Sequence, residues 1–205
     1  MANFLFTKYI TILTEALKTV DVNKLEEIKF EINKRIDGNG EIHIIGNGGS
    51  CANAHHIVGD YMKSFAFCGK RLKINCLSDN SCYLTAAAND LDYSKIYEIL
   101  VNSRINKSDL LIVLSGSGNS LNLVKAIRAA KSKGIKTAGI VSYSGGALLD
   151  LLDIPIYVRV NDMEISEDSQ LSIFHFIKQS ILKEIGDGQD QIIKYKKRVS
   201  DDLIA

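Results

Sequence analysis

The sequence predicts one α/β domain in which a parallel β-sheet carries helices on both faces. From Glu41 onward, short apolar runs alternate with amphipathic helical segments, as in repeated strand–helix–strand units. Two of these runs are followed by glycine- and serine-rich loops that lead directly into helices. The length of 205 residues allows one such domain with a helical extension, but not two large domains.

Two amphipathic helices are expected before the sheet, in residues 1–38. Apolar residues recur at helical spacing over residues 3–19 and again over residues 22–36. Asp21 suits the turn or cap between them. Their apolar faces could pack on the domain or on a second subunit, and the sequence does not separate these options.

The α/β core is expected to occupy residues 39–187. The expected strands span residues 41–45, 72–77, 109–114, 136–141 and 154–158. The expected helices span residues 51–66, 81–89, 94–102, 121–133, 146–151 and 167–185. Ser166 is expected to cap the last of these helices, and residues 188–205 are expected to form a terminal helical tail. In such sheets ligands bind beyond the carboxyl ends of the strands.

The composition argues against several classes of protein. Lys and Arg number 25 against 24 Asp and Glu, so no overall field attracts nucleic acid or an acidic membrane surface. The four cysteines show no Cys-x-x-Cys spacing, which argues against zinc fingers and disulfide frameworks. No apolar run reaches membrane-spanning length, and the N-terminus does not resemble a leader. We therefore expect a cytoplasmic protein with no nucleic-acid or membrane partner.

The most informative stretch is the loop Ser115-Gly-Ser-Gly-Asn-Ser120, between an apolar run and a helix. Glycines let the backbone turn closely, and the amides, the three hydroxyls and the helix dipole then gather at one point. This arrangement suits an anion. The loop lacks the Gly-Lys-Ser/Thr ending of nucleoside triphosphatases, so a single phosphate monoester, such as a sugar phosphate, suits it better. Taken alone, the hexamer also fits an ordinary turn.

A second loop, Gly46-Asn-Gly-Gly-Ser50, repeats the strand, loop and helix arrangement. It is not a dinucleotide fingerprint, because Cys51 stands where a glycine or alanine is required. Neither loop contains the Gly-x-Ser-x-Gly motif of a hydrolase nucleophile elbow. We therefore expect no nucleotide cofactor.

Polar residues on two expected helices are candidates for chemistry. Spacings of three, four and three place four of them on one helical face, which could line a pocket or face solvent: Asn53, His56, Asp60 and Lys63. On the last helix, Glu167 and His175 are separated by roughly 80° round the axis, so both could reach one partner. Taken alone, a histidine among apolar residues, such as His175, is more often a structural core residue than a catalyst.

Together these residues resemble the sugar isomerase (SIS) domain. Within it they resemble the phosphoheptose isomerases, which interconvert sedoheptulose 7-phosphate and a heptose 7-phosphate for bacterial surface polysaccharide. The motifs that carry the resemblance are, in chain order, Gly46-Asn-Gly-Gly-Ser50 with His56, Ser78-Asp79 followed by Asn89-Asp90, Ser115-Gly-Ser-Gly-Asn-Ser120, and Glu167 with His175. The resemblance implies a flavodoxin-like parallel sheet, N-terminal helices packed between subunits, and a homotetramer.

The resemblance also implies which residues act. Substrate binding is assigned to Asn47, Gly48, Gly49, Ser50, Asn53, Asn89, Asp90, Ser115, Gly116, Ser117 and Ser120. The family's metal-binding and acid/base positions fall on His56, Asp60, Glu167 and His175, and two histidines with two carboxylates could bind zinc. The chain departs from the family pattern twice, because Asp60 replaces glutamate and Glu167 replaces glutamine. Asp60 reaches about 1.5 Å less far than glutamate.

The expected activity is an aldose–ketose isomerisation of a phosphorylated sugar through an enediol(ate). Such a reaction needs a base and an acid on opposite sides of C1–C2, and we assign Asp60 as the base and His175 as the acid, with exchange of roles open. The alternative is a non-catalytic SIS protein that binds a phosphosugar or a protein partner such as the bacterial replication initiator.

Overall fold

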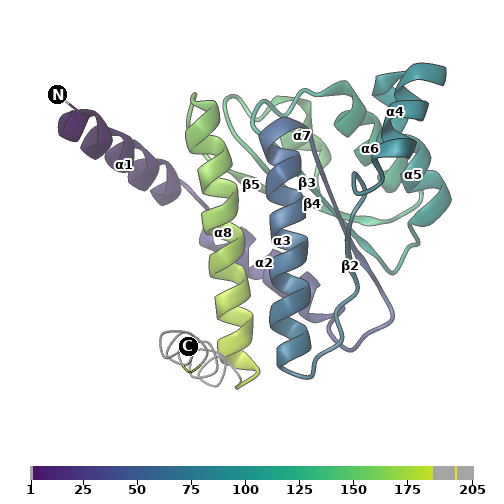
Figure 1. Ribbon diagram of the computed structural model, residues 1–205, viewed down its shortest axis with the longest axis horizontal. Coiled ribbons are helices and arrows are strands. Elements are labelled where there is room, and N and C mark those ends of the chain that lie inside the picture. The colour runs from purple at the N-terminus through teal and green to yellow at the C-terminus, as the bar shows by residue number, and fades with distance from the viewer. Residues whose placement is uncertain (1, 187–196, 198–205) are drawn as a thin grey trace, which may run out of the picture.

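The computed structural model describes residues 2–186 and residue 197, and it confirms the α/β sheet (Figure 1). Five parallel strands lie in the order β2-β1-β3-β4-β5. Their bounds are β1 Ile42–Gly46, β2 Ile74–Cys76, β3 Leu110–Ser115, β4 Lys136–Val141 and β5 Ile154–Tyr157. The apolar runs predicted as strands are therefore the buried strands of one sheet.

The helices alternate with the strands as predicted. Their bounds are α1 Ala2–Lys18, α2 Val22–Asn33, α3 Gly48–Phe67, α4 Ser81–Asp90, the 3₁₀ turn η1 Tyr93–Lys95, α5 Ile96–Arg104, α6 Leu121–Ser132, α7 Gly146–Leu151 and α8 Met163–Glu184. Asp21 caps α2, as predicted, by accepting a hydrogen bond from the Asn23 amide at 2.9 Å. The predicted helical tail, residues 188–205, lies outside the described residues apart from residue 197.

Two helix starts differ from the sequence prediction by three residues or more. α3 begins at Gly48 instead of Cys51, so the glycines of the first loop form the first helical turn. α8 begins at Met163, because the Asp162 carboxylate accepts a hydrogen bond from the Ile165 amide and caps the helix. The prediction that Ser166 is the cap was wrong. Its side chain is buried inside α8 and its hydroxyl donates to Ser142 Oγ at 2.7 Å.

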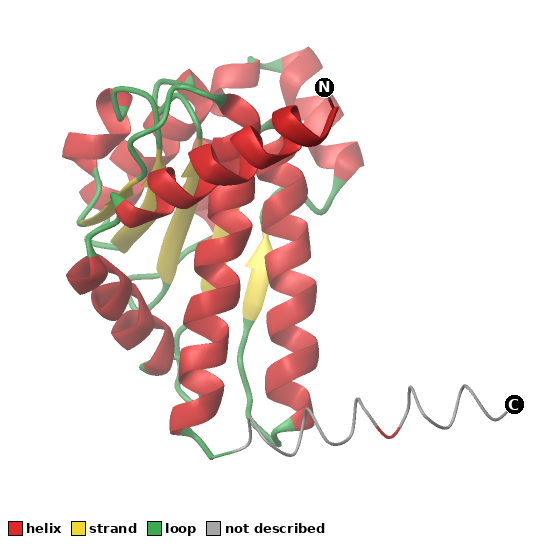
Figure 2. Cartoon of the chain, turned by 90° about the vertical axis from the view of Figure 1, so that its left-hand side faces the viewer, coloured by secondary structure: helices red, strands yellow, loops and turns green. Residues whose placement is uncertain are grey.

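Helices cover both faces of the sheet and make three layers. Along β1, the side chains of Ile42 and Ile44 pack on the layer that contains α1, α2, α3 and α8, while Ile45 packs on the layer of α4, α5, α6 and α7. The two long helices α3 and α8 run side by side along one face (Figures 1 and 2). Their contact builds much of the site described below.

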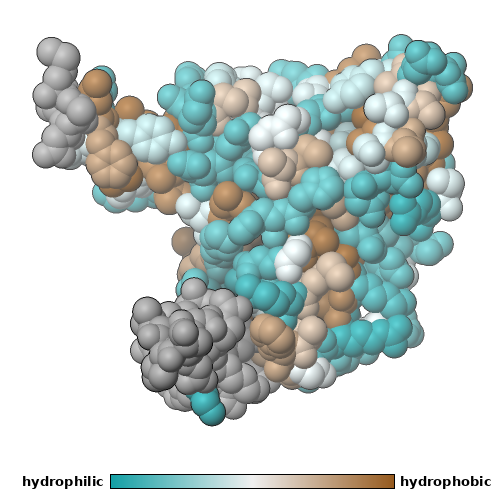
Figure 3. Space-filling view, in the orientation of Figure 1, coloured by the Kyte–Doolittle hydropathy of each residue, from teal (hydrophilic) through white to brown (hydrophobic). Residues whose placement is uncertain are grey.

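Helix α1 extends away from the body of the molecule (Figure 1). Near its C-terminal end Ala16 is buried, but toward its N-terminal end Leu5, Phe6 and Ile10 are 60%, 65% and 44% exposed. These residues contribute to the apolar patch on the projecting helix in Figure 3. Within the described part of the chain, no helix combines the length and the apolar character needed to cross a membrane.

Candidate active site

Strands β1 and β3 are neighbours in the sheet, yet the chain continues from them to opposite sides, to β2 and to β4. Such a reversal of strand order opens a crevice at the carboxyl ends of the two strands, where ligands of α/β sheets bind. The loop of residues 46–50 follows β1, and the loop of residues 115–120 follows β3. The two predicted binding loops therefore lie side by side at the crevice.

The 115–120 loop is held by close backbone packing. Gly118 has φ +66°, and a Cβ atom there would lie 1.9 Å from the Gly145 carbonyl oxygen. A Cβ atom on Gly116 would lie 2.5 Å from Met163 Sδ. Gly118 needs glycine because its neighbour is backbone and its φ is positive, whereas the Met163 side chain beside Gly116 can move.

The hydroxyl groups of this loop are not equivalent. Ser115 is buried and its Oγ accepts from the Gly118 amide at 3.1 Å, so it stabilises the turn. Ser117 Oγ accepts from the Asn119 amide at 3.3 Å. Ser120 is the N-cap residue of α6, and its side chain makes no capping hydrogen bond. Of the three predicted phosphate ligands, Ser120 has the hydroxyl that the loop itself does not use.

A reciprocal pair of amides joins the two loops. Asn47 and Asn122 each donate to the other's side-chain oxygen at 2.9 Å, and the Tyr93 hydroxyl donates to Asn47 Oδ1 at 3.1 Å. Asn122 is buried in the first turn of α6. Asn47 was predicted as a substrate contact, whereas the importance of Asn122 was missed because its partner lies on another strand–helix unit.

The predicted substrate residues Ser50 and Asn53 face α8. Gln170, which is buried, donates to Ser50 Oγ and accepts from Asn53 Nδ2, each at 3.0 Å. Asn53 Nδ2 also donates to the Glu167 carbonyl oxygen at 2.9 Å. The three buried side chains thus tie the start of α3 to α8. The Gln170 contribution was missed because the sequence does not show that α3 and α8 are neighbours.

Glu167 lies against the first turn of α3. A Cβ atom on Gly49 would lie 2.1 Å from Glu167 Oε2, so the glycine makes room for this carboxylate. Burial, and then the nearby carboxylates of Glu164 and Asp168, raise the pKa of Glu167, while the Ser50 backbone opposes the shift. The Glu167 carboxylate, carried by α8, therefore lies beside the glycine-rich start of α3.

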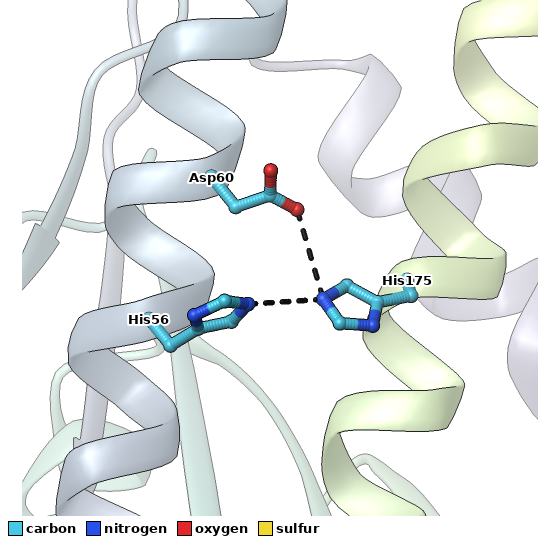
Figure 4. A group of neighbouring side chains, drawn as sticks. All are labelled: His56, Asp60 and His175. Atoms are coloured by element: carbon cyan, nitrogen blue, oxygen red, sulfur yellow. Dashed lines mark hydrogen bonds and ion pairs between the residues drawn. The ribbon is translucent and has the colours of Figure 1, made fainter.

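Further along the two helices, His56, Asp60 and His175 point toward one another (Figure 4). The Nε2 atoms of His56 and His175 are 3.1 Å apart, and His175 Nε2 lies 3.8 Å from Asp60 Oδ2. The predicted helical face of α3 thus meets the predicted histidine of α8. Burial lowers the pKa of His175; Lys178 and His56 act in the same direction, while Asp60 opposes them.

Glu167, predicted as a fourth member, is not in this group of described residues. The spacing argument used only the rotation of roughly 80° round the helix. Eight residues also rise about 12 Å along the axis, which separates the Glu167 position from His175. The three grouped residues and Glu167 are thus two parts of the site.

Lys178, one turn after His175, was not predicted. Its ammonium group contacts Asp60 Oδ2 directly. The Lys178 side chain is 14% exposed and that of Asp60 is 16% exposed, so the pair is largely removed from water. An exposed ion pair contributes little to stability, but the attraction within a pair this buried is screened less by water and salt.

The donor atoms suit a divalent metal by type and spacing, but the charge beside them does not, because the Lys178 ammonium group already contacts Asp60 Oδ2. Ligand atoms of His56, Asp60 and His175 all lie within 4.8 Å of one another. Two imidazoles and one carboxylate form a common three-residue set for catalytic zinc. Any such ion would share Asp60 with the Lys178 ammonium group.

The remaining predicted residues are more exposed. Asn89 and Asp90, at the end of α4, are exposed, and Asn89 Nδ2 donates to Asp90 Oδ1 at 2.7 Å. His55 Nε2, next to His56 on α3, lies 3.2 Å from Ser78 Oγ. By contrast, His43 is buried in β1, an inner strand of the sheet.

Comparisons with known proteins agree with this architecture. Residues 5–142 match the SIS domain family. A phosphoheptose isomerase of Burkholderia pseudomallei (strain 1710b) is 36% identical over 138 residues, which are 67% of this chain and 70% of the relative. One of Sulfurimonas denitrificans is 32% identical over 168 residues, 82% of this chain and 86% of the relative. The structure of a phosphoheptose isomerase from Francisella tularensis superposes with a TM-score of 0.79 at 22% identity, covering 89% of this chain and 96% of that one.

Proposed function

Because the chain belongs to the SIS-domain family of the phosphoheptose isomerases, we propose that it interconverts an aldose phosphate and a ketose phosphate. Sedoheptulose 7-phosphate is the first candidate substrate, by analogy with these relatives. The observation that carries the proposal is the convergence of Asp60 and His175 from two helices, one of which begins at a binding loop.

The reaction needs two proton transfers at neighbouring carbon and oxygen atoms. One group removes the proton next to the carbonyl carbon, and the other protonates the carbonyl oxygen, which gives the enediol(ate). We assign the first role to Asp60 and the second to His175, and the reverse assignment uses the same geometry. The lowered pKa of His175 keeps its imidazole neutral near pH 7, and a neutral imidazole can still donate its N–H.

The phosphate group is assigned to the 115–120 loop. The start of α6 offers backbone amides and the Ser120 hydroxyl, and the helix dipole favours an anion there. Binding the distant phosphate orients the reacting carbons and contributes to the rate without taking part in the chemistry.

We further propose that the chain is a homo-oligomer, with a tetramer implied by the family resemblance. The exposed Leu5 and Phe6 on the projecting α1 support this, because a second subunit would bury them (Figure 3). Cytoplasmic heptose synthesis for surface polysaccharide is the setting that the same resemblance implies.

The test is an exchange measurement on purified protein. Incubation with sedoheptulose 7-phosphate in deuterated water should incorporate deuterium next to the carbonyl and yield the aldose phosphate, as followed by nuclear magnetic resonance. A panel of other sugar phosphates identifies the preferred substrate. If folded protein binds these sugars without exchange, the catalytic proposal is wrong and a phosphosugar-binding role replaces it.

A further inference from the structure

We propose that the Lys178 ammonium group takes the place of a divalent metal beside Asp60, and that this cation holds Asp60 in position for the reaction. The turnover part of this inference rests on the proposed isomerase function, whereas the metal-binding part does not. Lys178 is a positioning residue in this account, because it acts through Asp60.

The first argument is the contact itself. The ammonium group touches Asp60 Oδ2, the same oxygen that lies 3.8 Å from His175 Nε2. Both side chains of the ion pair are less than one-fifth exposed. By contrast, the helical pair Lys18–Glu15 has side chains that are 66% and 62% exposed. The buried cation is therefore fixed at the carboxylate oxygen that a metal would need.

The second argument is the local charge. His56 and His175 are neutral as metal ligands, so Asp60 is the one anion of the three-residue group. Lys178 already balances that charge. The other described charge on this face of α3 is Lys63, which is exposed and also positive. A divalent ion would leave uncompensated positive charge in a half-buried site, which disfavours its binding.

The third argument is the distance of the remaining carboxylate. Glu167 lies two helical turns away from His175 along α8, about 12 Å by the helical rise. Its carboxylate instead lies against Gly49. The Glu167 carboxylate is therefore too far from the cluster to offset the positive charge that a metal would add beside Lys178. The Lys178 ammonium group is thus the cation of this site.

The metal-binding test uses full-length protein that has been treated with a chelator and desalted. Zinc is titrated calorimetrically into the wild type, Lys178→Met and the matched control Lys63→Met. Lys178→Met should bind zinc at least tenfold more tightly than the wild type, and Lys63→Met should bind it as the wild type does. Adding His56→Ala to Lys178→Met should remove the gain, which places the ion at this cluster. Equal zinc affinity in the wild type and Lys178→Met would overturn the proposal.

The turnover test separates this inference from the isomerase proposal. Exchange by the wild type should be unchanged by chelator. Lys178→Met should lose at least tenfold in kcat with little change in KM and recover partly when zinc is added, and Lys178→Arg should retain more turnover than Lys178→Met. Chelator-sensitive exchange by the wild type would also overturn the proposal.

If no sugar phosphate is turned over, the isomerase proposal fails and the zinc titrations still decide the role of Lys178. Circular dichroism identifies a misfolded variant, and Lys178→Gln then replaces Lys178→Met.

Discussion

The two halves of the site are held in different ways. The 115–120 loop is fixed by backbone packing so close that Gly118 leaves no room for a Cβ atom. The cluster on α3 and α8 is fixed by side chains that meet across two helices, and His175 is 41% exposed. Packing of the first kind tolerates almost no substitution, whereas side-chain contacts of the second kind can be rearranged one residue at a time.

This difference bears on the departure from the family pattern at Asp60. The loop keeps the glycines and serines of the resemblance, whereas the helical cluster has Asp60 where the resemblance implies glutamate. A site can therefore keep its means of holding a phosphate ester while its reacting groups change. Substitutions in the helical cluster should therefore affect mainly turnover, whereas substitutions in the loop should affect mainly stability.

The largest effect is expected in the helical cluster. Asp60→Asn keeps the size of the side chain but removes the base, so kcat for the sugar phosphate should fall by about 10² to 10⁴. Binding of the same sugar phosphate should change little, because the loops hold the phosphate. Turnover and calorimetric binding measure the two quantities. Retention of more than one-tenth of wild-type kcat would remove Asp60 from the mechanism.

The next effect is a loss of stability in the loop. Gly118→Ala should lower the free energy of unfolding by about 3 kcal/mol or more, because it adds a backbone clash to an unfavourable positive φ. Gly69→Ala is the matched control, since Gly69 has the same φ of +66° and an added Cβ atom there would meet nothing within 4 Å. The control should cost about 1 kcal/mol. Urea denaturation of both variants measures the difference, and equal losses would show that the loop is not tightly packed.

The smallest expected effect is a change in the pH dependence of stability that arises from His43 in the sheet. Burial lowers the pKa of His43 below its ordinary 6.5, although Asp109 opposes the shift. The unfolded chain therefore takes up a proton that the folded chain does not, and stability falls as the pH drops below about 6.5. The loss is at most about 1.4 kcal/mol per pH unit, until the lower folded pKa is reached.

The variant His43→Gln cannot titrate and should lose less stability between pH 7.5 and 5.5 than the wild type does. Urea denaturation at several pH values measures this difference between the two proteins. Parallel curves for the two proteins would mean that His43 keeps its ordinary pKa in the folded state. The histidines of the cluster are present in both proteins and cancel in the comparison.

The sheet could be predicted from sequence because its strands are buried apolar runs. Helix starts were less accurate where capping competes, as at Asp162 and Ser166, since both residue types are good caps and only the fold decides between them. The glycines of the first loop likewise gave no sign that Gly48 already begins α3.

The site was predictable to the extent that its residues share one helix or one loop. His56 and Asp60 are four residues apart, so helical periodicity places them together. Asn122, Gln170 and Lys178 have their partners on other elements, and no local pattern marks them. The placement of Glu167 failed because periodicity gives an angle and the axial rise was left out.

The reciprocal hydrogen bonds between Asn47 and Asn122 join the two binding loops directly. Asn47 is the N-cap residue of α3, which carries His56 and Asp60, and Asn122 lies in the first turn of α6. One pair of amides thus connects the loop assigned to the phosphate with the helix that carries two of the three cluster residues.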